Sequence, residues 1–351
     1  MSASGYISTA LGNLDLSNLF QNTYTNSSNT ILTNYYTNSV SQVYVTFSVG
    51  TVLASSGFLQ NGVDISTLLQ PVAGEHVYNV AGTYTWTCPP YVKSVCIICV
   101  GSGGGADGTT GAGVSTPGTA GALSNFKNGA TVVCQANGGG KGTTLTGGAG
   151  GTVGTGTGGA GGAGALRTSG NGGAGGAGGY SGTGGAGGTG TVAPTAGTGG
   201  GGGGGGSNAT GGFSGSAGGV NIYGSGTNGA AGVNSGTPIY GGGGSGGANG
   251  NTGLNVVSGG AYGGGCFTFG TGSGITLGGG GGGALSYVNA YTTVPGNTYT
   301  VIVGLGGYLY YTTAPTVVYA TGGVGAVRIL WGNGRSFPST QVGTAFNSLI
   351  N

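Results

Sequence analysis

The sequence carries very little charge. Only 3% of its 351 residues are charged, and six basic against four acidic side chains give a formal net charge of +2. This balance lacks the strong positive field that attracts nucleic acids or anionic membranes. We therefore expect no nucleic-acid partner.

Side chains that could carry out catalysis are equally scarce. His76 is the only histidine, and the four carboxylates are Asp15, Asp64, Glu75 and Asp107. An active site needs several titratable groups to converge, and a glycosidase needs a pair of carboxylates. Glu75 and His76 are neighbours in the sequence and would point apart on an extended chain. The sequence therefore predicts that the protein is not an enzyme.

No cofactor or metal motif is complete. The cysteine count is five, an odd number that does not suit a disulfide scaffold and predicts free, buried thiols: Cys88, Cys96, Cys99, Cys134 and Cys266. Cys96 and Cys99 have a ligand-like spacing, but on a strand they would face opposite sides. The stretch 138–143 resembles a phosphate loop, yet Gly142 follows its lysine where Ser or Thr is needed. We expect no cofactor and no metal.

Long apolar runs are missing as well. The longest strongly apolar run, Val95–Val100, is far too short to span a bilayer. The first residues, Met1–Tyr6, lack the basic and apolar regions of a secretory signal. We expect synthesis in a cytoplasm and no membrane span.

Glycine, by contrast, is abundant, with 96 residues that concentrate between 138 and 283. Gly-Gly-Ala triplets, as in 172–179, have a period of three, which suits the three residues per turn of a polyproline II helix. Packed side by side, such polyglycine II helices could satisfy one another's peptide groups. Collagen is disfavoured because the chain has nine prolines, and a flexible linker is the other alternative.

Both flanks of this region have strand patterns. Residues 76–137 and 284–335 contain β-branched and aromatic runs bounded by turn residues, and 94–100 is apolar at nearly every position, as in a strand covered on both faces. We expect a mainly β protein: an antiparallel β-sandwich formed by both flanks, with 138–283 inserted as a polyglycine II or irregular region. Residues 336–351 would form a C-terminal tail.

The N-terminal segment, 1–75, contains two similar sequences. Residues 14–21 and 63–70 both follow the pattern apolar-Asp-apolar-Ser-x-Leu-apolar-Gln, which predicts a short helical turn capped by Asp15 or Asp64. Between them, 42–49 alternates as a half-buried strand does. We interpret the segment as a docking module, with a small β subdomain as the alternative. The apolar anchors would be Leu14, Leu16, Leu19, Phe20, Val63, Ile65, Leu68 and Leu69.

Tyrosines punctuate the glycine-rich region. Because tyrosine combines a flat apolar face with a polar tip, it suits contacts with sugars and protein surfaces. One interpretation is a surface binding site, and the alternative is that the rings cap the core of the glycine bundle. The residues concerned are Tyr180, Tyr223, Tyr240 and Tyr262.

Several motifs resemble glycine-rich virion proteins of bacteriophages and large DNA viruses. They are 82–87 with 95–100 leading into a glycine run, 280–286 with 295–301, the segment 63–68, and the closing stretch 325–338. Some phage tail-fibre adhesins of this kind carry layers of polyglycine helices. The resemblance implies a structural protein on the virion surface, either a minor capsid or vertex protein or a fibre component that attaches to the host.

The partners implied by that resemblance are other virion proteins, a host-surface glycan or protein, and further copies of the chain. The protein would be made in the host cytoplasm and reside in the virion. The alternative function is that of a cellular matrix or ice-binding protein that uses the same polyglycine II bundle.

Overall fold

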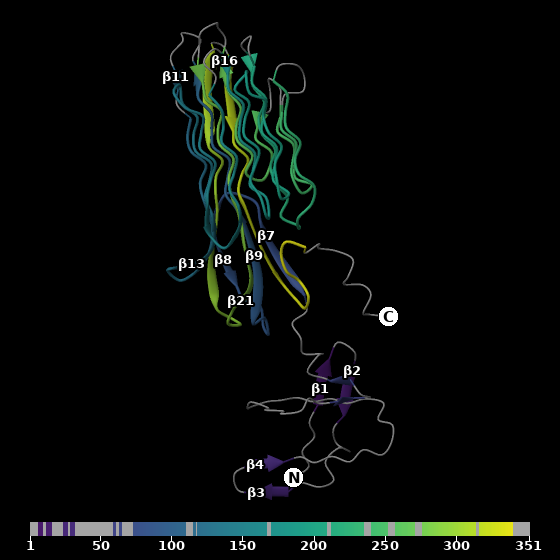
Figure 1. Ribbon diagram of the computed structural model, residues 1–351. Helices are drawn as coiled ribbons and strands as arrows, with labels where there is room; N and C mark the ends of the chain where they lie inside the picture. The colour runs from purple at the N-terminus through teal and green to yellow at the C-terminus, as the bar shows by residue number, and fades with distance from the viewer. Residues whose placement is uncertain are drawn as a thin grey trace. The chain divides into compact units, whose positions relative to one another are not determined.

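The computed structural model describes residues 73–339, except 110–114, 117, 167–169, 209–211, 235–239, 252–256, 271–275 and 314–315, and six short strands before residue 73. The chain divides into two compact units, residues 1–68 and 69–351. The described residues form strands and extended segments and no helix, which confirms a mainly β fold (Figure 1).

The short strands of the first unit form three antiparallel hairpins. They are β1 (Tyr6–Thr9) with β2 (Gly12–Asp15), β3 (Tyr24–Asn26) with β4 (Asn29–Ile31), and β5 (Leu59–Gln60) with β6 (Val63–Asp64).

The prediction of helical turns at 14–21 and 63–70 is therefore wrong for the first residues of each segment, which lie in strands. Leu14 pairs with Ile7 in β2, and Val63 pairs with Gln60 in β6. The sequence between β5 and β6 is Asn61-Gly62, a strong hairpin signal that outweighs the capping pattern. The other proposed anchors, Leu16, Leu19, Phe20, Ile65, Leu68 and Leu69, and the strand expected at 42–49 lie outside the described residues.

Two five-stranded antiparallel sheets form one end of the second unit. The first sheet has the order β14 (Val153–Thr155), β13 (Thr131–Ala136), β12 (Ser124–Asn128), β22 (Thr298–Val303), β8 (Gly82–Thr87). The second sheet has the order β15 (Thr157–Gly159), β21 (Leu285–Thr292), β9 (Ser94–Val100), β25 (Ala326–Trp331), β7 (Gly74–Tyr78). The chain passes between the sheets at both edges, because β14 adjoins β15 and β7 adjoins β8 in the sequence.

Both sheets contribute to one hydrophobic core. It includes Trp86 and Phe126 of the first sheet and Ile97 of the second. Strand β9 alternates strictly, because Val95, Ile97 and Cys99 belong to this core whereas Cys96, Ile98 and Val100 belong to a second cluster on the opposite face. The prediction that this strand is covered on both faces is confirmed.

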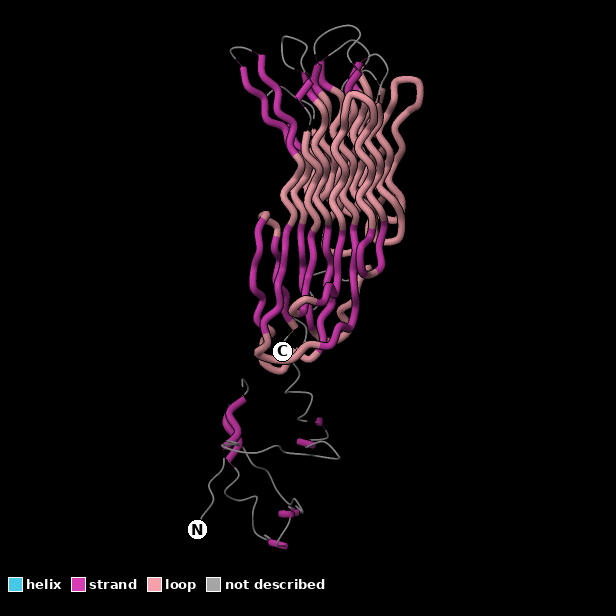
Figure 2. Tube along the Cα trace, turned by 90° about the vertical axis from the view of Figure 1, so that its left-hand side faces the viewer, coloured by secondary structure: helices cyan, strands magenta, loops and turns pink. Residues whose placement is uncertain are grey.

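Most of these strands continue into glycine-rich extended segments (Figure 2). Strand β9 continues into 101–107, β13 into 137–142 and β22 into 304–307, and the segments 277–284 and 322–325 lead into β21 and β25. The glycine segments thus begin at 101 and reach 325, outside the range 138–283 expected from the sequence. The difference arises because each flanking strand supplies a glycine segment of its own.

Segment 172–180 shows how these segments are joined. Its N–H groups follow a period of three, so that three successive residues donate to three different neighbouring segments. The first neighbour lies at 277–283, where the carbonyls of 277, 280 and 283 accept from 172, 175 and 178. The second lies at 182–188, where the carbonyls of 188, 185 and 182 accept from 173, 176 and 179. The third lies at 215–218, where the carbonyls of 215 and 218 accept from 174 and 177. The carbonyls of segment 172–180 accept from three further segments, through the N–H groups of 162 and 165, 202 and 205, and 265. The segment therefore has six hydrogen-bonded neighbours.

Glycine is required by this spacing. A Cβ atom on Gly176 would collide with the carbonyl of Gly202, and one on Gly173 with that of Gly205. The third position of the repeat has room for a methyl group, since Ala174 and Ala177 fit there with no exposed surface.

Further strands gather at the end of the unit opposite the two sheets, which we call the distal end (Figure 1). They are β10 (Gly108–Thr109), β11 (Ser115–Thr116), β16 (Gly170–Asn171), β17 (Gly212–Phe213), β18 (Val257–Ser258), β19 (Phe269–Gly270), β20 (Thr276–Leu277), β23 (Tyr308–Thr313) and β24 (Thr316–Thr321). We call the other end, where β7 begins and β25 ends, the base.

Candidate functional site

The four tyrosines proposed as a surface site differ in exposure. Tyr180 is fully buried, Tyr223 is 41% exposed, and Tyr240 and Tyr262 are half-buried. Tyr180 belongs to the second cluster, and Tyr262 packs against it, whereas Tyr240 is not part of it.

Tyr180 does not contribute to a surface site. Its hydroxyl donates to the carbonyl of Asn221 at 3.0 Å and accepts from the N–H of Gly224 at 2.9 Å. Its ring fills the space between the end of segment 172–180 and the second sheet, so the alternative interpretation, a core-capping ring, is correct for this residue. Burial also raises the pKa of its hydroxyl.

Tyr223 covers a buried arginine. The guanidinium carbon of Arg328, on β25, lies 4.7 Å from the centroid of the Tyr223 ring, a cation–π distance. The Arg328 side chain has no exposed surface and pairs with Glu75 of β7, with Nη2 2.7 Å and Nε 2.8 Å from Oε2. Its Nη1 donates to the carbonyl of Ile222 at 2.9 Å. Arg328 thus holds the turn that carries Tyr223 against the second sheet.

One feature of the sequence indicates this buried pair. Arg328 is a single charge in the otherwise apolar strand Ala326–Trp331, and such a charge requires a partner when the strand is buried. Glu75 lies 253 positions away, so its role could not be identified from spacing. His76 lies on the other side of β7, where its ring is 5.9 Å from that of Trp331.

Residues 335–338 follow β25 and pack beside Tyr180, Arg328 and the turn that carries Tyr223. Phe337 is 3% exposed, its N–H donates to Asn289 Oδ1 at 2.9 Å, and Asn289 Nδ2 donates to its carbonyl at 2.7 Å. The carbonyl of Pro338 accepts from the N–H of Ser225 at 2.7 Å. The start of the expected C-terminal tail is therefore packed onto the second sheet, and residues 340–351 lie outside the described residues.

Arg335 gives this site a second cation. Its Nη1 donates to the carbonyls of Gly74 at 2.6 Å and Trp331 at 3.0 Å, and its Nη2 lies 3.6 Å from Glu75 Oε2. Burial, followed by the neighbouring Arg328, lowers the pKa of Arg335. One carboxylate thus faces two guanidinium groups.

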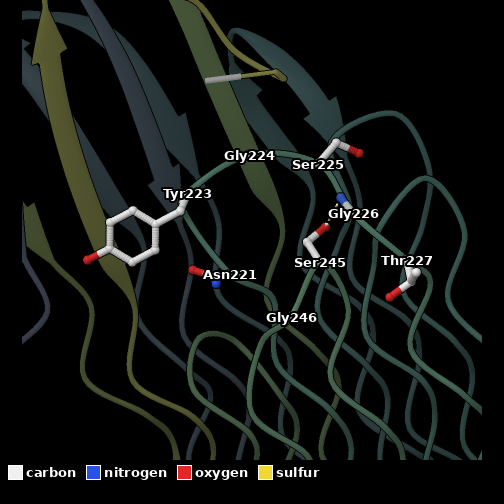
Figure 3. Close-up of a pocket in the computed structure, with 8 residues that line it drawn as sticks. All are labelled: Asn221, Tyr223, Gly224, Ser225, Gly226, Thr227, Ser245 and Gly246. Carbon is white, nitrogen blue, oxygen red and sulfur yellow. Dashed lines mark hydrogen bonds between the residues drawn. The ribbon is translucent and has the colours of Figure 1, made fainter. Parts of the chain in front are cut away.

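A hollow of about 370 Å³ lies beside Tyr223 (Figure 3). Its lining residues are uncharged: Asn221, Tyr223, Gly224, Ser225, Gly226, Thr227, Ser245 and Gly246. The Ser245 hydroxyl is held in place, since it accepts from the N–H of Gly226 at 3.1 Å and donates to the carbonyl of Gly200 at 2.8 Å. The Tyr223 ring points away from the hydroxyls of Ser225, Thr227 and Ser245. The hollow is thus uncharged and rich in hydroxyl groups, and the Tyr223 ring does not face those groups.

The cysteines lie inside the second unit. All five are free and buried, and Cys96 and Cys99 face different clusters, as expected for a strand. Burial raises the pKa of the Cys99 thiol and raises that of Cys266 to about 12.

Within the described part of the chain, no three His, Cys, Asp or Glu side chains are placed to hold a metal ion. The same residues include no helix long and apolar enough to cross a membrane. Asp107 is 1% exposed at the end of segment 101–107, where its backbone N–H donates to the carbonyl of Gly278 at 3.2 Å.

Comparison of the chain with protein-family models, with curated proteins and with solved structures finds no match.

Proposed function

We propose that the chain is a structural protein of the virion surface, in which a β-sandwich carries a bundle of polyglycine II helices away from the particle. The period of three in the hydrogen bonds of segment 172–180, with its six neighbours, supports polyglycine II packing. The two sheets with a shared core support the sandwich.

The observation that carries this proposal is the placement of the chain's connections. The described part of the second unit begins at Ala73, next to Gly74, which pairs with Trp331 at the base. The chain before residue 73 is therefore connected at the base, and the glycine segments extend to the other end (Figure 1). This arrangement suits a rigid projection that is attached at one end.

Host contact is the second part of the proposal. The hollow offers neutral hydroxyl and amide groups for hydrogen bonds, and the Tyr223 side chain beside it is 41% exposed; groups of both kinds occur in sites that recognise sugars. The partner would be a host-surface glycan. Further virion proteins would hold the base, after synthesis of the chain in the host cytoplasm.

The attachment is tested by deleting residues 1–72, which retains β7 and the Glu75 partner of Arg328. We expect the shortened chain to remain folded and soluble. Its second unit should unfold at a midpoint close to that of the same unit in the full chain. The shortened chain should be missing from purified particles. Immunogold labelling and quantitative immunoblotting of particles made with either chain measure this. Normal incorporation of the shortened chain would contradict the docking role of 1–72, and absence of the full chain from particles would contradict the proposed function.

A further inference from the structure

The base exposes an aromatic side chain on strained backbone. Tyr91 is 66% exposed and has a φ of 66°, in the left-handed region that bulky residues rarely occupy. Glycine or asparagine would adopt this conformation at lower cost. A strained and exposed tyrosine therefore indicates a requirement other than folding.

The turn that carries Tyr91 is held firmly. The turns 88–93 and 293–297 are joined by four hydrogen bonds: Cys88 N–H to Asn297 O at 2.9 Å, Gly296 N–H to Cys88 O at 2.9 Å, Thr293 N–H to Lys93 O at 2.9 Å and Thr293 Oγ1 to Val92 O at 3.1 Å. Val92, next to Tyr91, is 1% exposed in the core of the two sheets. The tyrosine is thus presented on a fixed support, which lowers the entropy cost of binding.

Its neighbours make a mixed apolar and basic surface. Val294 is 54% exposed, and Pro90, Pro295 and Lys93 are exposed around it. We call these five residues, Pro90, Tyr91, Lys93, Val294 and Pro295, the base surface.

The charge of the second unit favours an acidic partner. Residues 69–351 hold all six basic side chains and two acidic ones, Glu75 and Asp107. Glu75 is paired with Arg328 and Arg335, and Asp107 is buried at the other end of its unit. No carboxylate of this unit is left to pair with Lys93, so the charge of this surface complements an acidic surface rather than a second copy of itself.

We propose that the base surface docks onto an acidic surface of another virion protein. Tyr91 would enter an apolar pocket of that protein, flanked by the prolines and Val294, and Lys93 would meet a carboxylate. Tyrosine is one of the residues that most often carry the binding energy of an interface. The proposal rests on the proposed function, in that it takes the partner from the particle.

The substitution Tyr91→Gly separates binding from folding. It removes the side chain and relieves the left-handed strain, so we expect an unchanged or higher unfolding midpoint together with an incorporation into particles that falls about tenfold or more. Tyr308→Ser, which removes a tyrosine that is 47% exposed at the distal end, is the matched control and should leave incorporation unchanged. Lys93→Glu should also reduce incorporation.

If the wild-type chain is present in particles and Tyr91→Gly is present at the same level, the inference is wrong and the proposed function stands. If the wild-type chain is absent, the proposed function itself fails.

A cross-link identifies the partner. With p-benzoylphenylalanine at position 91 of the full chain, irradiation of assembled particles should join this residue to a different virion protein, at a peptide near Asp or Glu residues. A cross-link to the same chain or to a second copy, or no cross-link in particles that contain the chain, would overturn the proposal.

Discussion

At the scale of single residues, glycine sets the distance between backbones. Glycine loses more backbone entropy on folding than any other residue. In segment 172–180 each N–H from 172 to 180 has an acceptor on a neighbouring segment, so hydrogen bonds offset that loss. The approach that makes those bonds leaves no room for Cβ atoms at the first two positions of the triplet.

Substitution within one triplet tests this explanation. Gly176→Ala should destabilise the protein by about 1–3 kcal/mol, because its methyl group would meet the carbonyl of Gly202 and push two backbones apart. Ala174→Gly, which removes a buried methyl group two residues away, should cost only about 1 kcal/mol. Urea unfolding of both variants measures the difference. An equal or smaller loss for Gly176→Ala would contradict the packing described.

At the scale of elements, the segment 335–338 joins parts that are distant in the sequence. Phe337 contacts the rings of Tyr180 and Tyr287 at centroid distances of 6.2 and 6.0 Å and lies 5.8 Å from the guanidinium carbon of Arg328. Asn289 of β21 bonds the backbone of Phe337, and the N–H of Ser225, in the turn that carries Tyr223, donates to the carbonyl of Pro338. This short segment therefore fixes the candidate glycan site to the second sheet.

Removal of one ring should loosen that connection. Phe337→Ala should cost about 3 kcal/mol, because a buried ring is lost from the second cluster. Amide exchange should accelerate first at 221–228, whose turn loses its support, while β12 and β22 of the first sheet exchange as before. Ser336→Ala, at an exposed neighbouring position, is the control and should leave both properties unchanged. Uniform acceleration over both sheets would show that the segment has no local role.

At the scale of the whole second unit, stability depends on apolar burial and backbone hydrogen bonds rather than on cross-links. All five thiols are free and buried. Burial raises the pKa of Cys99, Cys266 and Tyr180. In the folded state these groups therefore keep their protons at pH values where the unfolded chain has lost them.

This difference predicts a loss of stability at alkaline pH. A raised pKa in the folded state means that stability is complete below the unfolded pKa, about 8.5 for a thiol, and falls as pH rises toward the folded value, about 12 for Cys266. The urea midpoint, measured under reducing conditions, should fall between about pH 8.5 and 11. Cys266→Ala should make that fall shallower. A midpoint that does not change over this range would contradict the burial of ionisable groups.

Much of the fold could be predicted because the strand patterns are local. The nearly continuous apolar run at 94–100 predicts a strand covered on both faces, and the triplets at 172–179 predict a period of three. The hairpin at 59–64 was also predictable from Asn61-Gly62, although the pattern at 63–70 is equally typical of a capped helical turn. Of the four tyrosines proposed for the surface, Tyr223 alone has a large exposed fraction, because exposure depends on which segment ends against the second sheet.

The sequence by itself determines that the glycine-rich part lacks charge and has a period of three, which suits extended helices with three residues per turn. The three-dimensional arrangement alone selects which segments become neighbours. It brings Glu75 to Arg328 across 253 positions and buries Tyr180 while it leaves Tyr223 and Tyr91 exposed. Identical glycine repeats contain no information about their partners, so the strands at the base and the turns at both ends must set the register.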